Sequence, residues 1–385
     1  MSAPAAPASP VRLGIVGTGQ VVLSSYLPIL VRIPGVQVVA LCDVNPERLA
    51  LAVSGVQERG GGYPVQAYAD YRELLERDDL DAVLVATPTD RHEEVAVAAL
   101  RRGLDVLLEK PMSPTLAGAR RILDAWRASG RLLQVGYVYR YSPLIRRLVE
   151  LLRGGEIGAV RQFWVHEFRG AFYEAWRFDP ERSGGALLEK ICHHADLFNW
   201  ALGCLPVRVF AVGGQAVMRR GETVEVLSVL GTTIRVTDSR VVDHAWVVAE
   251  YESGAVGSYG VNFFCPYGFW GRDRQDHESL EIGAIGERGA VLCHVRRHEI
   301  RVRRAASGEE QVITIPPASG GPAGWHTGTA EQLEAFVQCV RTRTPPLADG
   351  VAGLAGMLLP LAAERSIATG APVAVREIAG QEVTA

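Results

Sequence analysis

The sequence lacks the features that would place it in several specialised classes of protein. Its six cysteines are scattered without any CxxC pair, which argues against a disulfide framework or a zinc knuckle and fits a reducing cytoplasm. Basic and acidic residues nearly balance, 40 against 43, so the chain has no overall basic field to hold nucleic acid or an anionic membrane. We therefore expect a cytoplasmic protein with no nucleic-acid partner and no membrane partner.

We also expect neither a signal peptide nor a membrane-spanning run. The first ten residues, MSAPAAPASP, lack the basic start and apolar core of a signal peptide, so we expect a disordered tail over residues 1–10 and a shorter one over 377–385. The most apolar late stretch, Val351–Ala363, is shorter than the roughly 18 residues that a membrane span needs. Pro360 interrupts it and indicates either a kink or the start of a second helix.

What is present is a chain of 385 residues that is 48% hydrophobic, enough for two domains with real cores. The first third alternates short apolar runs with helical segments. Nearly continuous apolar strands separated by helices predict a parallel sheet covered on both faces, over residues 11–137. The expected strands are Val11–Val16, Val36–Cys42, Ala82–Ala86, Val106–Leu108 and Leu132–Val135.

The alternation stops after about Arg140, and the pattern predicts a second α/β domain over residues 138–376. A helix at Pro143–Arg153 leads into strands with period-two polarity and turns that contain glycine. This pattern favours a mostly antiparallel sheet that is open on one face. Such a face can serve dimerisation, and we expect a homo-oligomer, a dimer or a tetramer.

A glycine-containing turn follows the first predicted strand and opens the first helix. Gly17 permits a tight turn, and Gly19 lets a pyrophosphate approach the backbone at the helix N-terminus, where unpaired N–H groups and the helix dipole favour an anion. Two glycines at this spacing are often only a turn, so the prediction depends on the strand before them and the helix after them. The residues assigned to the cofactor phosphates are Gly17, Thr18, Gly19, Gln20 and Val21.

Two further residues bear on the cofactor. Asp43 ends the second strand, about twenty residues after the turn, where a carboxylate accepts hydrogen bonds from ribose hydroxyls and repels a 2′-phosphate. We therefore expect NAD in preference to NADP, although Arg48 offers a site for the extra phosphate. Val22 stands where a third small residue is usual, so either the helix packs farther from the strand or the loop differs.

Two more strand ends carry polar residues. Thr87-Pro88-Thr89 and then His92 follow one strand, and Glu109-Lys110-Pro111 follows the next. The carboxyl ends of neighbouring parallel strands form the ligand-binding edge of such a sheet. We assign Thr87, Pro88, His92, Glu109 and Lys110 to the cofactor crevice; the alternative is an ordinary surface pair of Glu109 and Lys110.

The densest chemistry lies in the helical segment after Ser183-Gly184-Gly185. Glu189, His193 and Asp196 are spaced i, i+4 and i+7, so they share one face of that helix. One alternative is a structural helix with an ordinary Glu–His pair. Another is a metal site that adds Cys192, but a cysteine at this spacing leaves the shared face, so we expect no metal.

These motifs together resemble the Gfo/Idh/MocA family, named after glucose–fructose oxidoreductase and inositol dehydrogenase. The resemblance runs from Val11 to about Val375 and includes GIVGTG, ATPT followed by His92, EKP, GYVYRYSP and GGALLEKICHHAD. It implies a Rossmann domain, an α/β substrate domain with an open sheet, a nicotinamide cofactor and frequent oligomers. The family's catalytic lysine and histidine fall on Lys110 and His193, but Glu189 replaces its aspartate and Ile191 replaces a glycine.

The expected reaction is hydride transfer between NAD and a secondary alcohol or ketone of a sugar or cyclitol. His193 would be the base for the hydroxyl proton, because histidine suits this role near neutral pH. Lys110 would hydrogen-bond the same oxygen, and Glu189 would bind a neighbouring hydroxyl or orient His193. Further residues expected near the substrate are Tyr139, Arg140 and His326, and further residues expected near the cofactor are Trp176 and Arg177.

Two other functions stay open at this point. One is an NAD-dependent glycosidase or lyase that oxidises its substrate only transiently and shows no net redox change. The other is a regulatory protein that senses dinucleotides without turnover. Because Lys110 and His193 are both present and a sensor would need neither, we rank the sensor last.

Overall fold

The first domain is built on a six-stranded parallel sheet in the order β3-β2-β1-β4-β5-β6. The structure is a computed structural model that describes residues 9–59, 64–265, 278–316 and 328–380. Its inner strands are buried on both faces, which explains their nearly continuous apolar sequence. The strands are β1 (Val11–Val16), β2 (Val36–Cys42), β3 (Gln66–Tyr68), β4 (Ala82–Val85), β5 (Asp105–Leu108) and β6 (Leu133–Val135).

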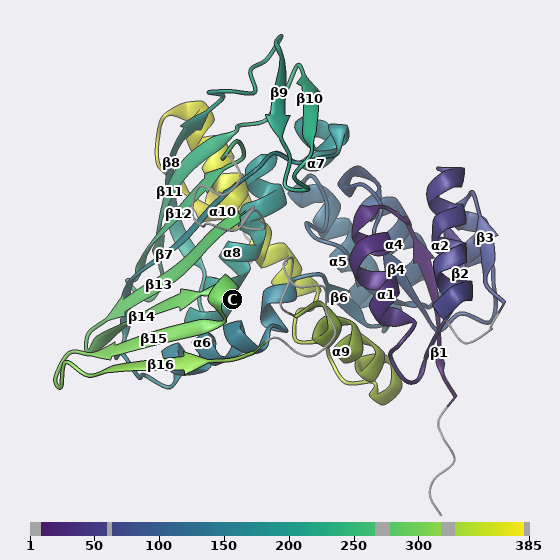
Figure 1. Cartoon of the computed structure of the whole chain (residues 1–385), viewed down its shortest axis with the longest axis horizontal. Helices are drawn as coiled ribbons and strands as arrows, with labels where there is room; N and C mark the ends of the chain where they lie inside the picture. Colours follow the sequence, from purple (N-terminus) through teal and green to yellow (C-terminus); the bar gives the residue numbers. More distant parts are fainter. Residues whose placement is uncertain (1–8, 60–63, 266–277, 317–327, 381–385) are drawn as a thin grey trace, which may run out of the picture.

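Helices cover both faces of this sheet, as the sequence predicts for a Rossmann domain (Figure 1). Helices α3, α4 and α5 pack on one face, and the segments η1, α1 and α2 pack on the other. The bounds are η1 (Val22–Tyr26), α1 (Leu27–Leu30), α2 (Pro46–Arg59), α3 (Tyr71–Leu75), α4 (His92–Arg101) and α5 (Leu116–Ser129). The chain later returns to this domain, because α9 (Thr329–Thr342) packs against η1, α1 and β1.

The second domain is built on a nine-stranded sheet in the order β16-β15-β14-β13-β7-β12-β11-β8-β17. Strands β7 and β12 pair in parallel and the other neighbours are antiparallel, so the sheet is mixed but mostly antiparallel, as predicted. The strands are β7 (Val160–Arg169), β8 (Pro206–Gly214), β11 (His244–Tyr251), β12 (Val256–Asn262), β13 (Glu278–Gly286), β14 (Gly289–His294), β15 (Glu299–Arg304), β16 (Glu310–Thr314) and β17 (Val373–Ala374).

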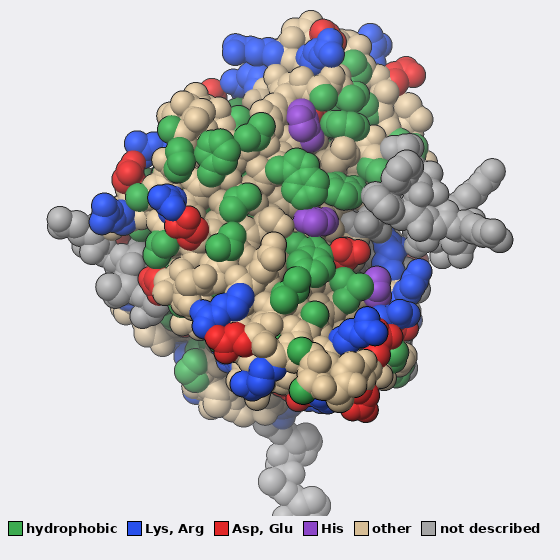
Figure 2. Space-filling view, turned by 90° about the vertical axis from the view of Figure 1, so that its left-hand side faces the viewer, with side chains coloured by type: hydrophobic (Ala, Val, Ile, Leu, Met, Phe, Trp, Pro, Cys, Tyr) green, Lys and Arg blue, Asp and Glu red, His purple; other side chains and the backbone are tan. Residues whose placement is uncertain are grey.

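Among the described residues, helices cover one face of the nine-stranded sheet and leave the other without helices. Helices α6 (Pro143–Arg153), α8 (Ala186–Leu202) and α10 (Gly350–Thr369) pack on its inner side, between this sheet and the first domain (Figure 1). The outer side carries exposed apolar side chains, and histidine side chains lie among them (Figure 2). The predicted open face is therefore present.

Helix α10 continues through Pro360, so Pro360 does not start a second helix. By length and composition this helix of 20 residues could cross a membrane. It is longer than the apolar stretch Val351–Ala363 that the sequence indicated. In the structure 56% of its most apolar window is buried, and the helix packs against α8 and β8. Burial of this kind is typical of a core helix.

Several elements escaped the sequence analysis because they are short or mostly exposed. These are β3, α3, the last strands β16 and β17, and a separate hairpin of β9 (Thr223–Leu227) and β10 (Thr233–Thr237). A short helix, α11 (Val375–Ala379), extends into the segment suggested as a C-terminal tail. The first helix, expected directly after the glycine turn, contains a π-helical turn at η1.

Candidate active site

One cleft lies at the carboxyl ends of β1, β2, β4 and β5 and faces the first turns of α8. A parallel sheet binds ligands at this edge, because its helices begin there and present unpaired N–H groups. Most of the predicted site residues line the cleft: Gly17, Gly19, Gln20, Val21, Asp43, Thr87, Pro88, His92, Glu109, Lys110, Trp176, Arg177, Glu189 and His193.

The two glycines of the first turn have different surroundings. A Cβ on Gly17 would lie 2.5 Å from the Ala86 carbonyl oxygen, so the turn crosses the end of β4 at a distance that only glycine allows. A Cβ on Gly19 would meet nothing closer than Glu174 Oε1 at 4.0 Å. The backbone at Gly19 is therefore open to the cleft, as a pyrophosphate requires.

The helix after the turn differs from the usual dinucleotide fingerprint. Val22 is fully buried and starts the π-helical turn η1, in which the Leu27 N–H donates to the Val22 carbonyl. Neither wider helix–strand packing nor a different loop is tested by this feature, and the irregularity observed is in the helix itself. A π-turn widens the helix and is often found at functional sites.

Asp43 lies at the end of β2 beside the glycine turn. Its Oδ2 accepts hydrogen bonds from Thr18 N at 2.7 Å and Thr18 Oγ1 at 3.1 Å, and its Oδ1 accepts from Asn45 N at 2.8 Å. These bonds hold the carboxylate at the cleft wall, next to Arg48, which also lines the cleft. Thr18 thus supports Asp43 and is not itself part of the lining.

The segments after β4 and β5 are tied together by His92. Its Nδ1 lies 2.8 Å from the Pro111 carbonyl oxygen and its Nε2 lies 2.9 Å from the Thr87 carbonyl oxygen. Burial lowers the pKa of His92. Thr87 Oγ1 is buried and has no hydrogen-bond partner among the described residues, so the cleft offers this hydroxyl to a bound group. Together with Gly19, this orphaned hydroxyl fits a dinucleotide.

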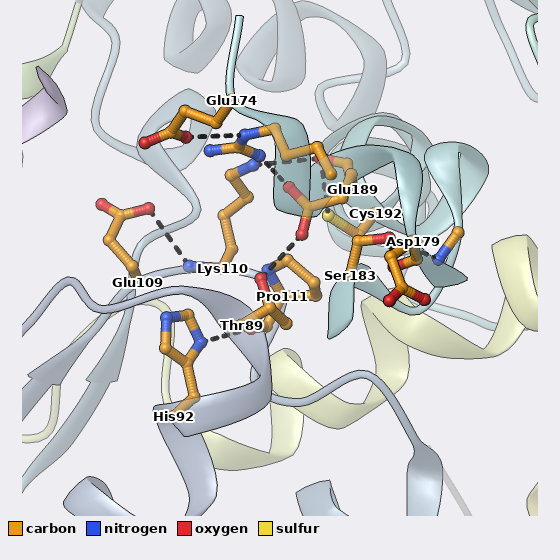
Figure 3. Close-up of polar contacts among 12 residues, drawn as sticks. Thr89, His92, Glu109, Lys110, Pro111, Glu174, Asp179, Ser183, Glu189 and Cys192 are labelled. Atoms are coloured by element: carbon orange, nitrogen blue, oxygen red, sulfur yellow. Dashed lines mark hydrogen bonds and ion pairs between the residues drawn. The ribbon is translucent and has the colours of Figure 1, made fainter. Parts of the chain in front are cut away.

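Lys110 connects the two domains at the cleft. Its Nζ donates to the Glu189 carbonyl oxygen at 3.0 Å, in the first turns of α8 (Figure 3). This bond places the lysine head beside the face of α8 that carries Glu189 and His193. Residues 79 positions apart in sequence thereby meet in one site.

Both carboxylate oxygens of the buried Glu189 have partners in the structure. Oε1 accepts from Thr89 Oγ1 at 2.7 Å, and Oε2 pairs with Arg177 Nη1 (Figure 3). Arg177 also donates through Nε to Glu174 at 3.0 Å. Burial alone would lower the pKa of Arg177, but the carboxylates of Glu189 and Glu174 raise it above its usual value. In the cleft wall the Arg177 guanidinium therefore lies between the carboxylates of Glu189 and Glu174.

His193 lies on the same face of α8, one turn after Glu189, and is 3% exposed. The ring of Tyr139 lies against it, with centroids 5.2 Å apart, and Tyr137 approaches at 6.0 Å. His194 points away, as its helical angle predicts, and its Nε2 lies 2.8 Å from Glu167 Oε2 inside the second domain. Of the two histidines, only His193 lines the cleft.

Three predicted substrate residues lie outside the described lining. Tyr139 is buried behind His193, and Arg140 forms an ion pair with the buried Asp196 at 2.8 Å. Arg140 Nη1 also donates to the Leu347 carbonyl oxygen, which commits this side chain to the interior. His326 lies outside the residues that the structure describes. Their assignment to the substrate stays a prediction.

The sequence analysis missed several residues of the cleft: Tyr26, Thr89, Arg169, Phe172, Tyr173, Glu174 and Lys190. Thr89 and Lys190 adjoin residues that were singled out, so their neighbourhood was a usable signal. Arg169 and Tyr173 reach the cleft because β7 pairs with β12 and β13, and no local pattern predicts that pairing.

The suggested metal-ligand set does not converge. Within residues 9–59, 64–265, 278–316 and 328–380, no three histidine, cysteine, aspartate or glutamate side chains are grouped to hold a metal ion. Asp196 pairs with Arg140, and the Cys192 sulfur faces the Glu189 carbonyl at 3.9 Å.

Curated relatives include dehydrogenases of inositols. The chain is 30% identical over 194 residues to an inositol 2-dehydrogenase of Salmonella typhimurium, covering 50% of this chain and 54% of that enzyme. It is 23% identical over 372 residues to the scyllo-inositol 2-dehydrogenase (NAD(+)) of Bacillus subtilis, covering 94% and 96%. The chain thus spans about half the length of the inositol 2-dehydrogenase to which it is 30% identical.

Solved structures share the whole architecture. An oxidoreductase domain protein from Kribbella flavida superposes with a TM-score of 0.80 at 22% identity, covering 95% of this chain and 99% of that one. Levoglucosan dehydrogenase in complex with NADH and levoglucosan gives a TM-score of 0.78 at 19% identity, covering 95% and 100%. At these identities the likeness shows the fold.

Two family models match most of the chain. The NAD-binding Rossmann fold of an oxidoreductase family covers residues 11–137, and the C-terminal alpha/beta domain of the same family covers residues 149–375. The chain therefore belongs to the Gfo/Idh/MocA family of NAD(P)-dependent oxidoreductases.

Proposed function

We propose that this protein is a dehydrogenase or ketoreductase that acts on a secondary alcohol or ketone of a sugar or cyclitol. The observation that carries the proposal is the convergence of Lys110, Glu189 and His193 in the cleft that also contains the open glycine turn. Inositol 2-dehydrogenases among the relatives support a cyclitol, and the relative bound to NADH and levoglucosan supports a sugar.

In the oxidation direction, His193 accepts the proton of the substrate hydroxyl at its ring nitrogen. A base placed in this way typically contributes about 10²–10⁴-fold to the rate. Lys110 donates a hydrogen bond to the same oxygen and stabilises the negative charge that develops there. The bound nicotinamide cofactor supplies the hydride acceptor. Glu189, held by Thr89 and Arg177, orients a neighbouring hydroxyl with its remaining acceptor capacity.

The cofactor that we propose is NAD. Asp43 presents a carboxylate at the cleft wall, held by Thr18 and Asn45, and a carboxylate there disfavours a 2′-phosphate. Arg48 lies in the same wall and is the residue that would favour NADP. Replacing Asp43 by alanine should therefore shift the preference toward NADP.

We also propose a homo-oligomer that buries the outer face of the nine-stranded sheet. Exposed apolar side chains gather on that face along β8 and β11 (Figure 2). Apolar patches of this kind on a sheet without covering helices mark protein interfaces.

The proposal is tested by measuring reduced nicotinamide formed by the purified protein. NAD and NADP are supplied separately against cyclitols, free sugars and simple glycosides. Reduction of NAD with one cyclitol or sugar group supports the dehydrogenase. Consumption of a glycoside without net reduction would replace it by the redox-neutral glycosidase or lyase, and reduction of NADP alone would overturn the role of Asp43.

A substitution tests the catalytic base. His193→Ala should lower turnover on the substrate found in that panel by at least about 100-fold and leave NADH affinity nearly unchanged, because the side chain faces the reacting end of the cleft. His294→Ala is the matched control, since His294 lies on β14 outside the cleft. Unchanged turnover in His193→Ala removes this residue from the mechanism.

A further inference from the structure

The π-helical turn after the glycine turn directs one aromatic side chain into the cleft. A π-turn inserts one more residue than an α-helical turn, and each helical residue advances by about 100°. Tyr26 is the last residue of η1, is 4% exposed and lines the cleft. Its hydroxyl donates to Oε1 of Glu109, 83 residues later in the chain.

The hydrogen bonds around Glu109 have one consistent direction. Burial, followed by the nearby charge of Glu109, raises the pKa of Tyr26 well above its usual value. The phenol therefore keeps its proton and donates a hydrogen bond to the carboxylate. Gln332 Nε2, on α9, donates to the Tyr26 oxygen at 3.4 Å. Oε2 of Glu109 accepts from the Lys110 N–H at 3.2 Å.

Among the described residues, this carboxylate accepts hydrogen bonds from the Tyr26 hydroxyl and the Lys110 backbone N–H. Glu109 is half-buried at the end of β5. A Cβ on Gly136 would lie 3.1 Å from Glu109 Oε1, so the lack of a side chain at Gly136 leaves room for the carboxylate. The next residue is Lys110, whose head binds α8. Glu109 therefore lies on the reacting side of the cleft, away from Asp43 at the end of β2.

We propose that Tyr26 is a positioning residue for dinucleotide binding: it holds the Glu109 carboxylate so that this group accepts a hydrogen bond from the ribose on the nicotinamide side. A carboxylate held by a buried donor loses less conformational freedom when the ribose hydroxyl binds, and preorganisation of this kind raises affinity. The inference depends on dinucleotide binding and not on the identity of the substrate.

The test is a titration of the full chain with NADH and, separately, with AMP. Tyr26→Phe should weaken NADH binding about tenfold, which corresponds to about 1.4 kcal/mol, and leave AMP binding unchanged, because AMP lacks the nicotinamide ribose. Tyr26→Phe combined with Glu109→Gln should bind NADH no more weakly than Glu109→Gln alone, because the tyrosine acts through the glutamate.

Tyr251→Phe is the matched control. It also removes a buried phenol, whose oxygen lies 2.6 Å from that of Tyr259 in the second domain, and it should leave both affinities unchanged. Equal losses for NADH and AMP in Tyr26→Phe would indicate a structural role and overturn the proposal. An unchanged NADH affinity would overturn it as well, and so would additive effects of the two substitutions. The substrate panel can fail without affecting any of these outcomes.

Discussion

Two glycines in one turn illustrate how differently single residues contribute to the site. Gly17 has φ +92°, and a Cβ there would lie 2.5 Å from the Ala86 oxygen, so its lack of a side chain serves the fold. Gly19 has open space beside it, so its lack of a side chain serves the ligand. Glycine is therefore required at the two positions for different physical reasons.

Substitutions at these positions should separate stability from binding. Gly17→Ala should destabilise the fold by about 2 kcal/mol or more, because strain at a positive φ alone costs of order 1–3 kcal/mol and the collision adds to it. Gly19→Val should keep the melting temperature but abolish NADH binding, because its side chain fills the space for the pyrophosphate. Thermal melts and NADH titrations of both variants check this. Retained NADH binding in Gly19→Val would refute the phosphate-binding turn.

Residue-scale reasoning from the sequence was most successful where a local motif determines the geometry. The helical spacing of Glu189 and His193 placed them on one face, and both line the cleft. Arg140 lies within the motif GYVYRYSP, and its assignment to the substrate stays a prediction. Its ion pair with Asp196 depends on the packing of α8 against the segment before α6, which no local motif encodes.

At the scale of elements, the N-terminus of α8 is the critical structure, because the helix carries Glu189 and His193. Its N-cap, Gly185, has no side chain to satisfy the first N–H groups. Glu364 of α10 replaces the cap: its Oε1 accepts from Leu187 N at 3.4 Å, and a Cβ on Gly185 would lie 2.6 Å from the same oxygen. A helix from the far end of the chain therefore supports the start of α8.

This contact predicts a pH-dependent stability. Burial raises the pKa of the Glu364 carboxyl to about 7, despite the Leu187 N–H, which lowers it. The folded state then holds a proton that the unfolded state releases near pH 4.5, so stability falls as the pH rises from about 4.5 to 7. A pKa difference of one between the folded and unfolded states corresponds to about 1.36 kcal/mol, so the free energy of unfolding falls by about 3 kcal/mol over this range.

Glu364→Gln removes this titration and keeps an acceptor for Leu187. We expect its melting temperature to exceed that of the wild type by more at pH 8 than at pH 5, measured by thermal unfolding at both values. Glu377→Gln is the control, because it removes an exposed carboxylate that pairs with Arg365 at 3.3 Å, and such pairs contribute little. A stability difference that does not grow with pH would contradict a protonated Glu364.

At the scale of the whole molecule, the most informative feature is the uncovered face of the second sheet. Trp246 lies opposite Val212 and Val248 lies opposite Phe210 across the pairing of β11 and β8. All four side chains are at least 39% exposed, and the ring of His166 lies 4.9 Å from that of Trp246. These cross-strand pairs lie next to each other, so exposed apolar side chains gather on this face (Figure 2), as is typical of a protein interface.

The proposed oligomer can be tested by placing charge in this patch. Trp246→Glu should shift the sedimentation velocity of the protein to that of the monomer, because an unpaired carboxylate buried in an apolar interface is costly. Leu51→Glu is the control, since Leu51 is 62% exposed on α2 in the other domain. A wild-type protein that sediments as a monomer would exclude this interface at the concentration used.

Local patterns along the chain suffice to predict the features that depend on neighbouring residues. The alternation of strands and helices, the open face of the second sheet, the glycine turn and the shared face of Glu189 and His193 all follow from periodicity and short motifs. Side-chain direction repeats every two residues in a strand and about every 3.6 in a helix, so such features are local consequences of the chain.

The contacts that complete the site join residues far apart in the chain and depend on tertiary packing. Tyr26 reaches Glu109 across 83 positions, Lys110 reaches Glu189 across 79, and Thr89 reaches Glu189 across 100. Helix α9 also returns to the first domain near the end of the chain. No local pattern encodes these pairs, because each depends on how whole elements pack, and packing is set by the sum of many buried contacts along distant parts of the chain.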